Sequence, residues 1–220
     1  MIYFKRSEGQ ELQAILDSAK SSDKEEAYRS GEVFDALKND FLRKCYLCED
    51  AEVTVPNVEH FEPHKRDPEK KYDWNNLFYA CGHCNNLKLH HFWPLLNCTV
   101  EADRIWEAVE IRFVPFPKPT VKIIAHPQNG KEKECTNTCA LVDKCLSGKD
   151  CTPIKQEGAR VLRKKMTREF TEIHKQIRKQ NIAGIKRMVA DNAPFAGMFR
   201  WLLKNEHPEL FQQTFGNALS

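Results

Sequence analysis

Apolar residues recur at helical spacing in the N-terminal part of the chain. Residues 8–20 and 31–44 both show this pattern, and in the second segment Val33, Leu37 and Phe41 fall on one face. We therefore expect two amphipathic helices that lie against the rest of the core.

A longer amphipathic pattern follows Thr152 and Pro153, which provide an N-cap and a proline in the first turn of a helix. Its apolar positions are Ile154, Val161, Leu162, Met166, Phe170, Ile173 and Ile177. Gly184 is a candidate break, and residues 195–205 predict a last helix. The C-terminal part is therefore expected to be helical.

Short β-prone runs lie between these helical regions. Residues 52–55 and 58–61 are separated by Pro56-Asn57, which predicts a hairpin, and residues 85–91 can open a helix. Residues 109–116 and 121–124 predict a second pair of strands. The pattern as a whole predicts an α+β fold that is mostly helical.

Four segments follow from this reading of the 220 residues. Residues 1–44 form an N-terminal helical segment, and 45–100 a compact core with paired cysteines. Residues 101–151 hold strands and a polar, Cys-rich stretch (126–151) with few apolar residues, and 152–220 form a basic helical region.

The chain has no run of about 18 apolar residues and no apolar signal-peptide region near its start. We therefore expect a cytoplasmic protein.

The nine cysteines change this picture most. In a reducing compartment, paired Cys-x2-Cys turns indicate metal ligands more often than disulfides. Cys45, Cys48, Cys81 and Cys84 form two such turns, with 32 residues between them. Two turns that each supply two thiolates complete the tetrahedron that structural Zn²⁺ prefers. The sequence therefore predicts a structural zinc site.

A second, less regular group of cysteines lies in the polar stretch. It consists of Cys135, Cys139, Cys145 and Cys151, and His126 is a possible substitute for one of them. A second structural zinc would stabilise a segment that has little core of its own. Scattered reduced thiols and an iron–sulfur cluster are the alternatives.

Positive charge gathers in the C-terminal region. Residues 155–187 carry 11 basic and 3 acidic residues, although the whole chain has a net charge of only +3. Such a patch is typical of proteins that bind a polyanion, and the contact candidates are Arg163, Lys164, Lys165 and Arg168. A solvated helix face and a docking surface for an acidic partner protein are the other interpretations.

Candidate catalytic chemistry lies between the two cysteine turns. Glu59 and His60 end a β-prone run, and Asn85 directly follows the second turn. A neutral imidazole that is held in place can act as a general base for water. Glu59 and Asn85 can supply two oxygen ligands to a Mg²⁺-type ion, which binds few protein groups and keeps several waters.

These residues fall in a pattern with a known counterpart. The segments 58–63 (Val-Glu-His-Phe-Glu-Pro), 74–77 (Trp-Asn-Asn-Leu) and 81–88 (Cys-Gly-His-Cys-Asn-Asn-Leu-Lys) resemble the HNH endonuclease, or ββα-metal, motif. The resemblance covers about residues 42–92. It implies a fold in which a ββα-metal core, fastened by the four-cysteine zinc site, is flanked by N-terminal helices and a long basic C-terminal helix.

The resemblance also implies a role for each matching residue. His60 matches the general base, and Glu59 and Asn85 match the metal ligands. Asn76, or its neighbour Asn75, matches the residue that orients the loop of the base, and Lys88 matches a basic residue that is a further candidate for nucleic-acid contact. Glu59 stands where Asp or His is commoner. Asn85 stands where many members have His, which favours Mg²⁺ or Mn²⁺ over Zn²⁺ as the catalytic ion.

The size and layout are similar to those of one subgroup, the PtuB-type HNH nucleases of bacterial Septu and retron anti-phage systems. That similarity implies an ABC-type ATPase partner of the PtuA kind, alone or with a retron reverse transcriptase and its DNA. The substrate would be nucleic acid, either DNA or RNA such as tRNA. The rival hypothesis is a zinc-stabilised nucleic-acid- or protein-binding module without catalysis.

Overall fold

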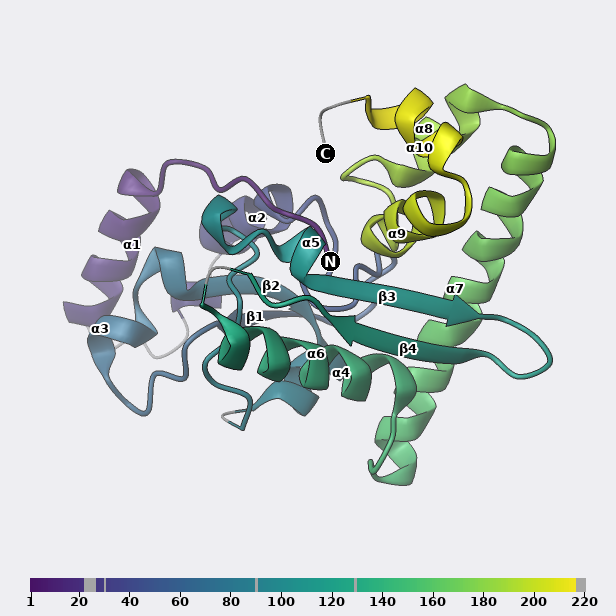
Figure 1. Cartoon of the computed structure of the whole chain (residues 1–220). Coiled ribbons are helices and arrows are strands. Elements are labelled where there is room, and N and C mark those ends of the chain that lie inside the picture. The colour runs from purple at the N-terminus through teal and green to yellow at the C-terminus, as the bar shows by residue number, and fades with distance from the viewer. Residues whose placement is uncertain (22–26, 30, 90, 129, 217–220) are drawn as a thin grey trace.

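The computed structural model describes residues 1–21, 27–29, 31–89, 91–128 and 130–216 (Figure 1). Two antiparallel strand pairs lie among helices. The longer helices are α1 (Gln10–Ser21), α2 (Gly31–Asp40), α4 (Gly82–Lys88), α6 (Glu132–Ser147), α7 (Pro153–Arg178), α8 (Ile182–Val189), α9 (Ala196–Glu206) and α10 (Pro208–Phe215). Single turns are α3 (Pro68–Lys71), α5 (Ile105–Ala108), η1 (Ala27–Arg29), η2 (Trp74–Asn76) and η3 (Glu101–Asp103). The α+β class and the predominance of helix are confirmed.

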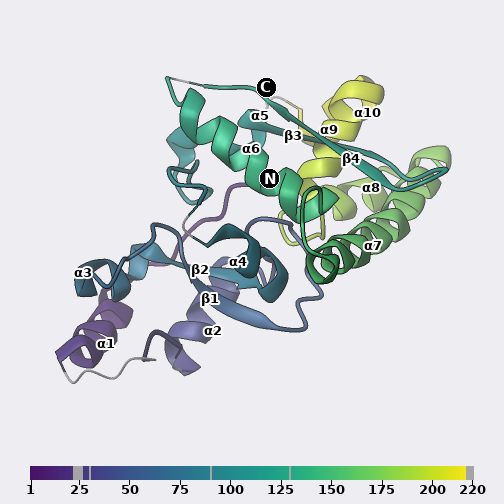
Figure 2. The same cartoon turned by 90° about the horizontal axis from the view of Figure 1, so that it is seen from below.

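The first sheet consists of β1 (Pro56–His60) and β2 (Leu77–Cys81), which pair with Pro56 opposite Cys81 and His60 opposite Leu77. The predicted hairpin between residues 52–55 and 58–61 is therefore wrong. Pro56 and Asn57 belong to β1 itself, whose partner strand comes after a loop of 16 residues (61–76). Helix α4 follows β2 without a gap and packs on both strands, so the order is strand, strand, helix (Figure 2).

The second sheet consists of β3 (Val109–Val114) and β4 (Thr120–Ala125), close to the predicted strand bounds. The polar, Cys-rich stretch that follows β4 packs into the protein and does not lie outside its core. Its residues 132–147 form α6, which packs on β4 and α7 and buries one face against them. The amphipathic pattern was obscured because cysteines, together with Leu141 and Val142, provide the buried face.

The predicted long helix is α7, which begins at Pro153 as expected. It ends at Arg178, and Gly184 lies inside the next helix, α8, where Asn181 caps the backbone N–H of Gly184. The predicted last helix is α9, but α10 follows it after His207. Among the described residues, no helix is both long and apolar enough to cross a membrane.

All four predicted segments contribute to one hydrophobic core. In the N-terminal half, the fully buried Phe41, just after α2, contacts Phe78 of β2, with ring centroids 5.1 Å apart. Burying a side chain of this size contributes about 1.5–3 kcal/mol, which holds the end of α2 against the first sheet. Close to Phe41, Lys44 and Glu49 form a buried ion pair, and Glu49 also accepts the backbone N–H of Gly197 at 3.1 Å. The first cysteine turn is thereby attached to the start of α9.

Candidate functional site

Four cysteines meet where the first sheet joins α4. Cys45 and Cys48 lie in the turn that follows α2, Cys81 ends β2, and Cys84 lies in the first turn of α4. All four are buried, and their sulfur atoms lie within 4.8 Å of one another. The Sγ atoms of Cys48 and Cys81 are 3.9 Å apart. The predicted tetrathiolate cluster is therefore present in the fold.

The donor set fits zinc. Zn–S bonds of about 2.3 Å in a tetrahedron place neighbouring sulfurs about 3.8 Å apart, which is close to the separation of Cys48 and Cys81. Four buried thiols with no disulfide among them would otherwise leave a polar, reactive cluster inside the protein. A Zn²⁺ ion held by Cys45, Cys48, Cys81 and Cys84 would join the end of α2 to β2 and α4. Its role would be structural, because four thiolates leave no open coordination position.

The second cysteine group does not form a metal site in this structure. Of the described residues, only Cys45, Cys48, Cys81 and Cys84 form a group of three or more metal ligands at such distances. Cys135 donates instead to the carbonyl of Ala108 at 3.3 Å, and Cys139 lies one helical turn away on α6. Cys145 faces Cys84. His126, the possible substitute ligand, bonds Glu110 at 2.6 Å. The geometry therefore favours reduced thiols over a second zinc, with Cys151 half-buried and the other three buried.

His60 lies at the end of β1 and is largely shielded from solvent. Its Nε2 is 3.0 Å from the carbonyl oxygen of Lys71. Because a carbonyl only accepts, Nε2 carries the proton, and the neutral ring keeps a lone pair on Nδ1. Burial lowers the pKa of His60 to about 4, so the imidazole is neutral at pH 7. A neutral imidazole with a free lone pair can accept a proton, although a pKa of about 4 makes it a weaker base than a free histidine.

Asn76 fixes the backbone around His60 from two sides. Its Oδ1 accepts the N–H of Glu62 at 2.7 Å, and its Nδ2 donates to the carbonyl oxygens of Glu62 at 3.0 Å and Lys70 at 2.9 Å. Glu62 follows His60 by two residues, and Lys70 precedes the residue whose carbonyl holds the imidazole. The neighbouring Asn75 is exposed. Of the two asparagines, Asn76 is therefore the one that orients the loop.

Glu59 does not present a free carboxylate. Its Oε1 accepts from Nζ of Lys88 at 2.6 Å, and the same ammonium donates to the carbonyl of His60 at 2.7 Å. Both side chains are buried, so the prediction that Lys88 contacts nucleic acid is wrong for this arrangement. Burial raises the pKa of Glu59, and the ammonium of Lys88 opposes that rise. A divalent cation at Glu59 would have to compete with Lys88, which the sequence pattern did not indicate.

Asn85, the other predicted metal ligand, lies on α4 one turn before Lys88 and is partly exposed. Its neighbour His83 is a structural residue that sequence reasoning missed. The ring of His83 bonds the carbonyl of Cys145 at 2.9 Å, and a Cβ atom on Gly158 would lie 2.3 Å from its Nδ1. His83 therefore fits between α6 and α7 and fixes α4 against them. Sequence reasoning missed this contact because His83 and Gly158 lie far apart in the chain.

The basic residues of α7 are largely engaged within the protein. Lys165 bonds Asp50 at 2.7 Å, and Arg168 bonds Glu52 at 3.0 Å. Arg163 donates to the carbonyl oxygens that end α6. Of the four predicted nucleic-acid contacts on this helix, only Lys164 is exposed without such a bond in the described structure. These contacts join α7 to the segment that leads into β1.

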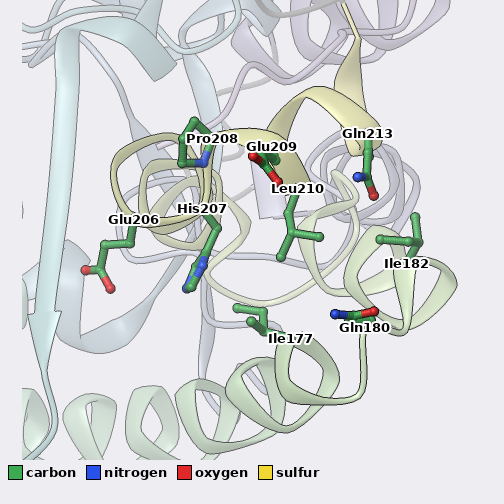
Figure 3. Close-up of a pocket in the computed structure, with 9 residues that line it drawn as sticks. All are labelled: Ile177, Gln180, Ile182, Glu206, His207, Pro208, Glu209, Leu210 and Gln213. Carbon is green, nitrogen blue, oxygen red and sulfur yellow. The ribbon is translucent and has the colours of Figure 1, made fainter.

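A cavity of about 560 Å³ lies away from His60, between α7, α8 and α10. Figure 3 shows Ile177, His207 and Leu210 pointing into it. Its lining contains none of the residues that the sequence predicted for chemistry or binding.

No protein-family model matches this chain, and no curated protein matches it. The functional argument therefore depends on the residues and on their geometry.

Proposed function

We propose that this protein is an HNH-type nuclease that hydrolyses phosphodiester bonds in DNA or RNA with the help of a divalent cation. One observation carries the proposal. His60 ends the first strand of a strand–strand–helix unit, with Nε2 held by a carbonyl and its loop held by the three hydrogen bonds of Asn76. This arrangement fixes the imidazole and leaves its Nδ1 available to accept a proton.

In this proposal, His60 accepts a proton at Nδ1 from the water that attacks phosphorus. Its low pKa keeps the base neutral near pH 7. Asn76 and the carbonyl of Lys71 hold the ring in the orientation that proton transfer needs. Mg²⁺ or Mn²⁺, when bound, would neutralise charge on the phosphate and the leaving oxygen. Glu59 and Asn85 would hold that ion, with Lys88 displaced from the carboxylate.

The test is a cleavage assay on plasmid DNA and on tRNA, each with Mg²⁺, with Mn²⁺ and with EDTA. The protein with His60→Ala should bind zinc and melt like the wild type but lose cleavage by at least about a hundredfold, the usual contribution of a general base. His207→Ala, a histidine beside the remote cavity, is the matched control and should cut normally. Cleavage by His60→Ala at the wild-type rate would overturn the assignment.

The ion pair between Lys88 and Glu59 favours a second candidate, a zinc-stabilised binding module without catalysis. There Lys88 would be the permanent partner of the carboxylate, and no catalytic metal would bind. This candidate predicts nucleic-acid or protein binding that EDTA leaves unchanged, together with no cleavage under any metal condition.

The resemblance to PtuB-type nucleases extends the proposal to anti-phage defence, with an ATPase partner of the PtuA kind and, in retron systems, a reverse transcriptase with its DNA. If such a partner licenses cutting, the isolated chain would be inactive. The cleavage assay is therefore repeated with the co-expressed ATPase, and the readout in cells is phage plaque formation. Equal plaque numbers with wild-type protein and with His60→Ala would contradict this part of the proposal.

A further inference from the structure

A tight turn beside His60 carries two adjacent cations in an unfavourable backbone conformation. Lys65 and Arg66 have φ angles of 48° and 71°, in the left-handed region that favours glycine. The turn is closed by the N–H of Asp67, which donates to the carbonyl of His64 at 2.7 Å. The N–H of Arg66 donates to Nδ1 of His64 at 3.1 Å. Placing two non-glycine residues there costs about 1–2 kcal/mol each, so stability does not explain them.

The charges of this loop are unbalanced in a particular way. The acidic side chains nearby already have partners: Glu62 pairs with Lys70, and Glu69 pairs with Lys20. Asp67 accepts the N–H of Glu69 as the N-cap of α3. No described acidic residue forms an ion pair with the remaining cations, which are Lys65, Arg66 and Lys71. Asp67 and Asp73 keep their negative charge although each caps a helical turn, so the three unpaired cations leave the loop with only a small net positive charge.

This positive edge is adjacent to the candidate base. The rings of His64 and His60 have centroids 4.6 Å apart. Lys71 supplies the carbonyl that holds His60. Lys65 and Arg66 are exposed and follow His64 directly, so a polyanion that contacts them lies near the His60 site. In the basic helix α7, by contrast, Lys165 and Arg168 are paired with Asp50 and Glu52.

We propose that the turn of residues 64–67, together with Lys71, is the phosphate-binding edge of the site and that the backbone of a nucleic acid lies across it. The inference rests on the proposed nuclease function and moves the principal nucleic-acid contact from α7 to this loop. Lys65 and Arg66 contact backbone phosphates next to the one that is cut. The contacts are electrostatic, so binding tolerates any base sequence and weakens steeply with salt.

The experiment is fluorescence anisotropy of a labelled DNA duplex and a labelled RNA strand of equal length, in EDTA, over a series of NaCl concentrations. The test variant is Lys65→Gly/Arg66→Gly, because glycine suits the left-handed backbone and should keep the fold. We expect about tenfold weaker binding at low salt. The slope of log affinity against log salt should fall by about two, since two phosphate contacts are lost.

Lys118→Ala/Lys122→Ala is the matched control. It also removes two exposed cations, but from the β3–β4 hairpin at the opposite end of the molecule from α3 (Figures 1 and 2). Equal affinity and slope for the glycine variant and the wild type, or equal losses in the control, would overturn the inference. His60→Ala keeps the two proposals distinguishable. If this variant still cuts, the nuclease proposal fails. Unchanged binding by the glycine variant refutes only the phosphate-binding role of the loop.

Discussion

Replacing Asn76 with alanine tests whether the loop around His60 is held as the structure indicates. Asn76 is 7% exposed and makes three side-chain hydrogen bonds, of 2.7, 2.9 and 3.0 Å, to backbone groups of Glu62 and Lys70. Each such bond contributes about 1 kcal/mol, so Asn76→Ala should lower the free energy of unfolding by about 3 kcal/mol. For a chain of this size, that corresponds to a fall in Tm of about 6–12 °C.

The assay is thermal and urea unfolding followed by circular dichroism, with the zinc content measured in parallel. Zinc should stay bound, because Asn76 touches none of the four cysteines in the described contacts. Asn75→Ala is the matched control, since that side chain is exposed and its effect should stay within about 0.5 kcal/mol. If both variants unfold alike, Asn76 does not hold the loop. If Asn76→Ala melts early but cuts normally, the positioning role in catalysis is refuted.

Two further outcomes follow from the buried polar groups. Cys84→Ser should abolish stoichiometric zinc binding, measured by elemental analysis, and lower Tm. Cys139→Ser should leave the zinc content unchanged. A loss of zinc in both variants would support a second metal site. Lys88→Met should lower the free energy of unfolding, measured with urea, by about 3–5 kcal/mol, because Glu59 would be buried without its partner. Adding Glu59→Gln should recover much of that loss. Strictly additive effects of the two substitutions would contradict the ion pair.

The local chemistry of the site was predictable from the sequence because it depends on short spacings. Two cysteines three positions apart can face one ion within a single turn, so the four-cysteine cluster followed from Cys45, Cys48 and their counterparts. The strand–strand–helix order and the orienting asparagine were also expected, although the strand pairing was not. Pairing joins residues 56–60 to 77–81, and the intervening loop gives no local signal of its partner.

Contacts between distant segments decided the rest. Lys165 and Asp50 are 115 positions apart, so the charge pattern of α7 alone could not reveal that its cations are neutralised. The second cysteine group has a plausible ligand spacing, yet the α-helix places Cys135 against Ala108 and Cys145 against Cys84. The sequence by itself determined which residues are candidates for metal binding and catalysis. Only the tertiary structure decided which charged side chains are paired within the protein and which remain available for binding, because side-chain pairing depends on proximity in space.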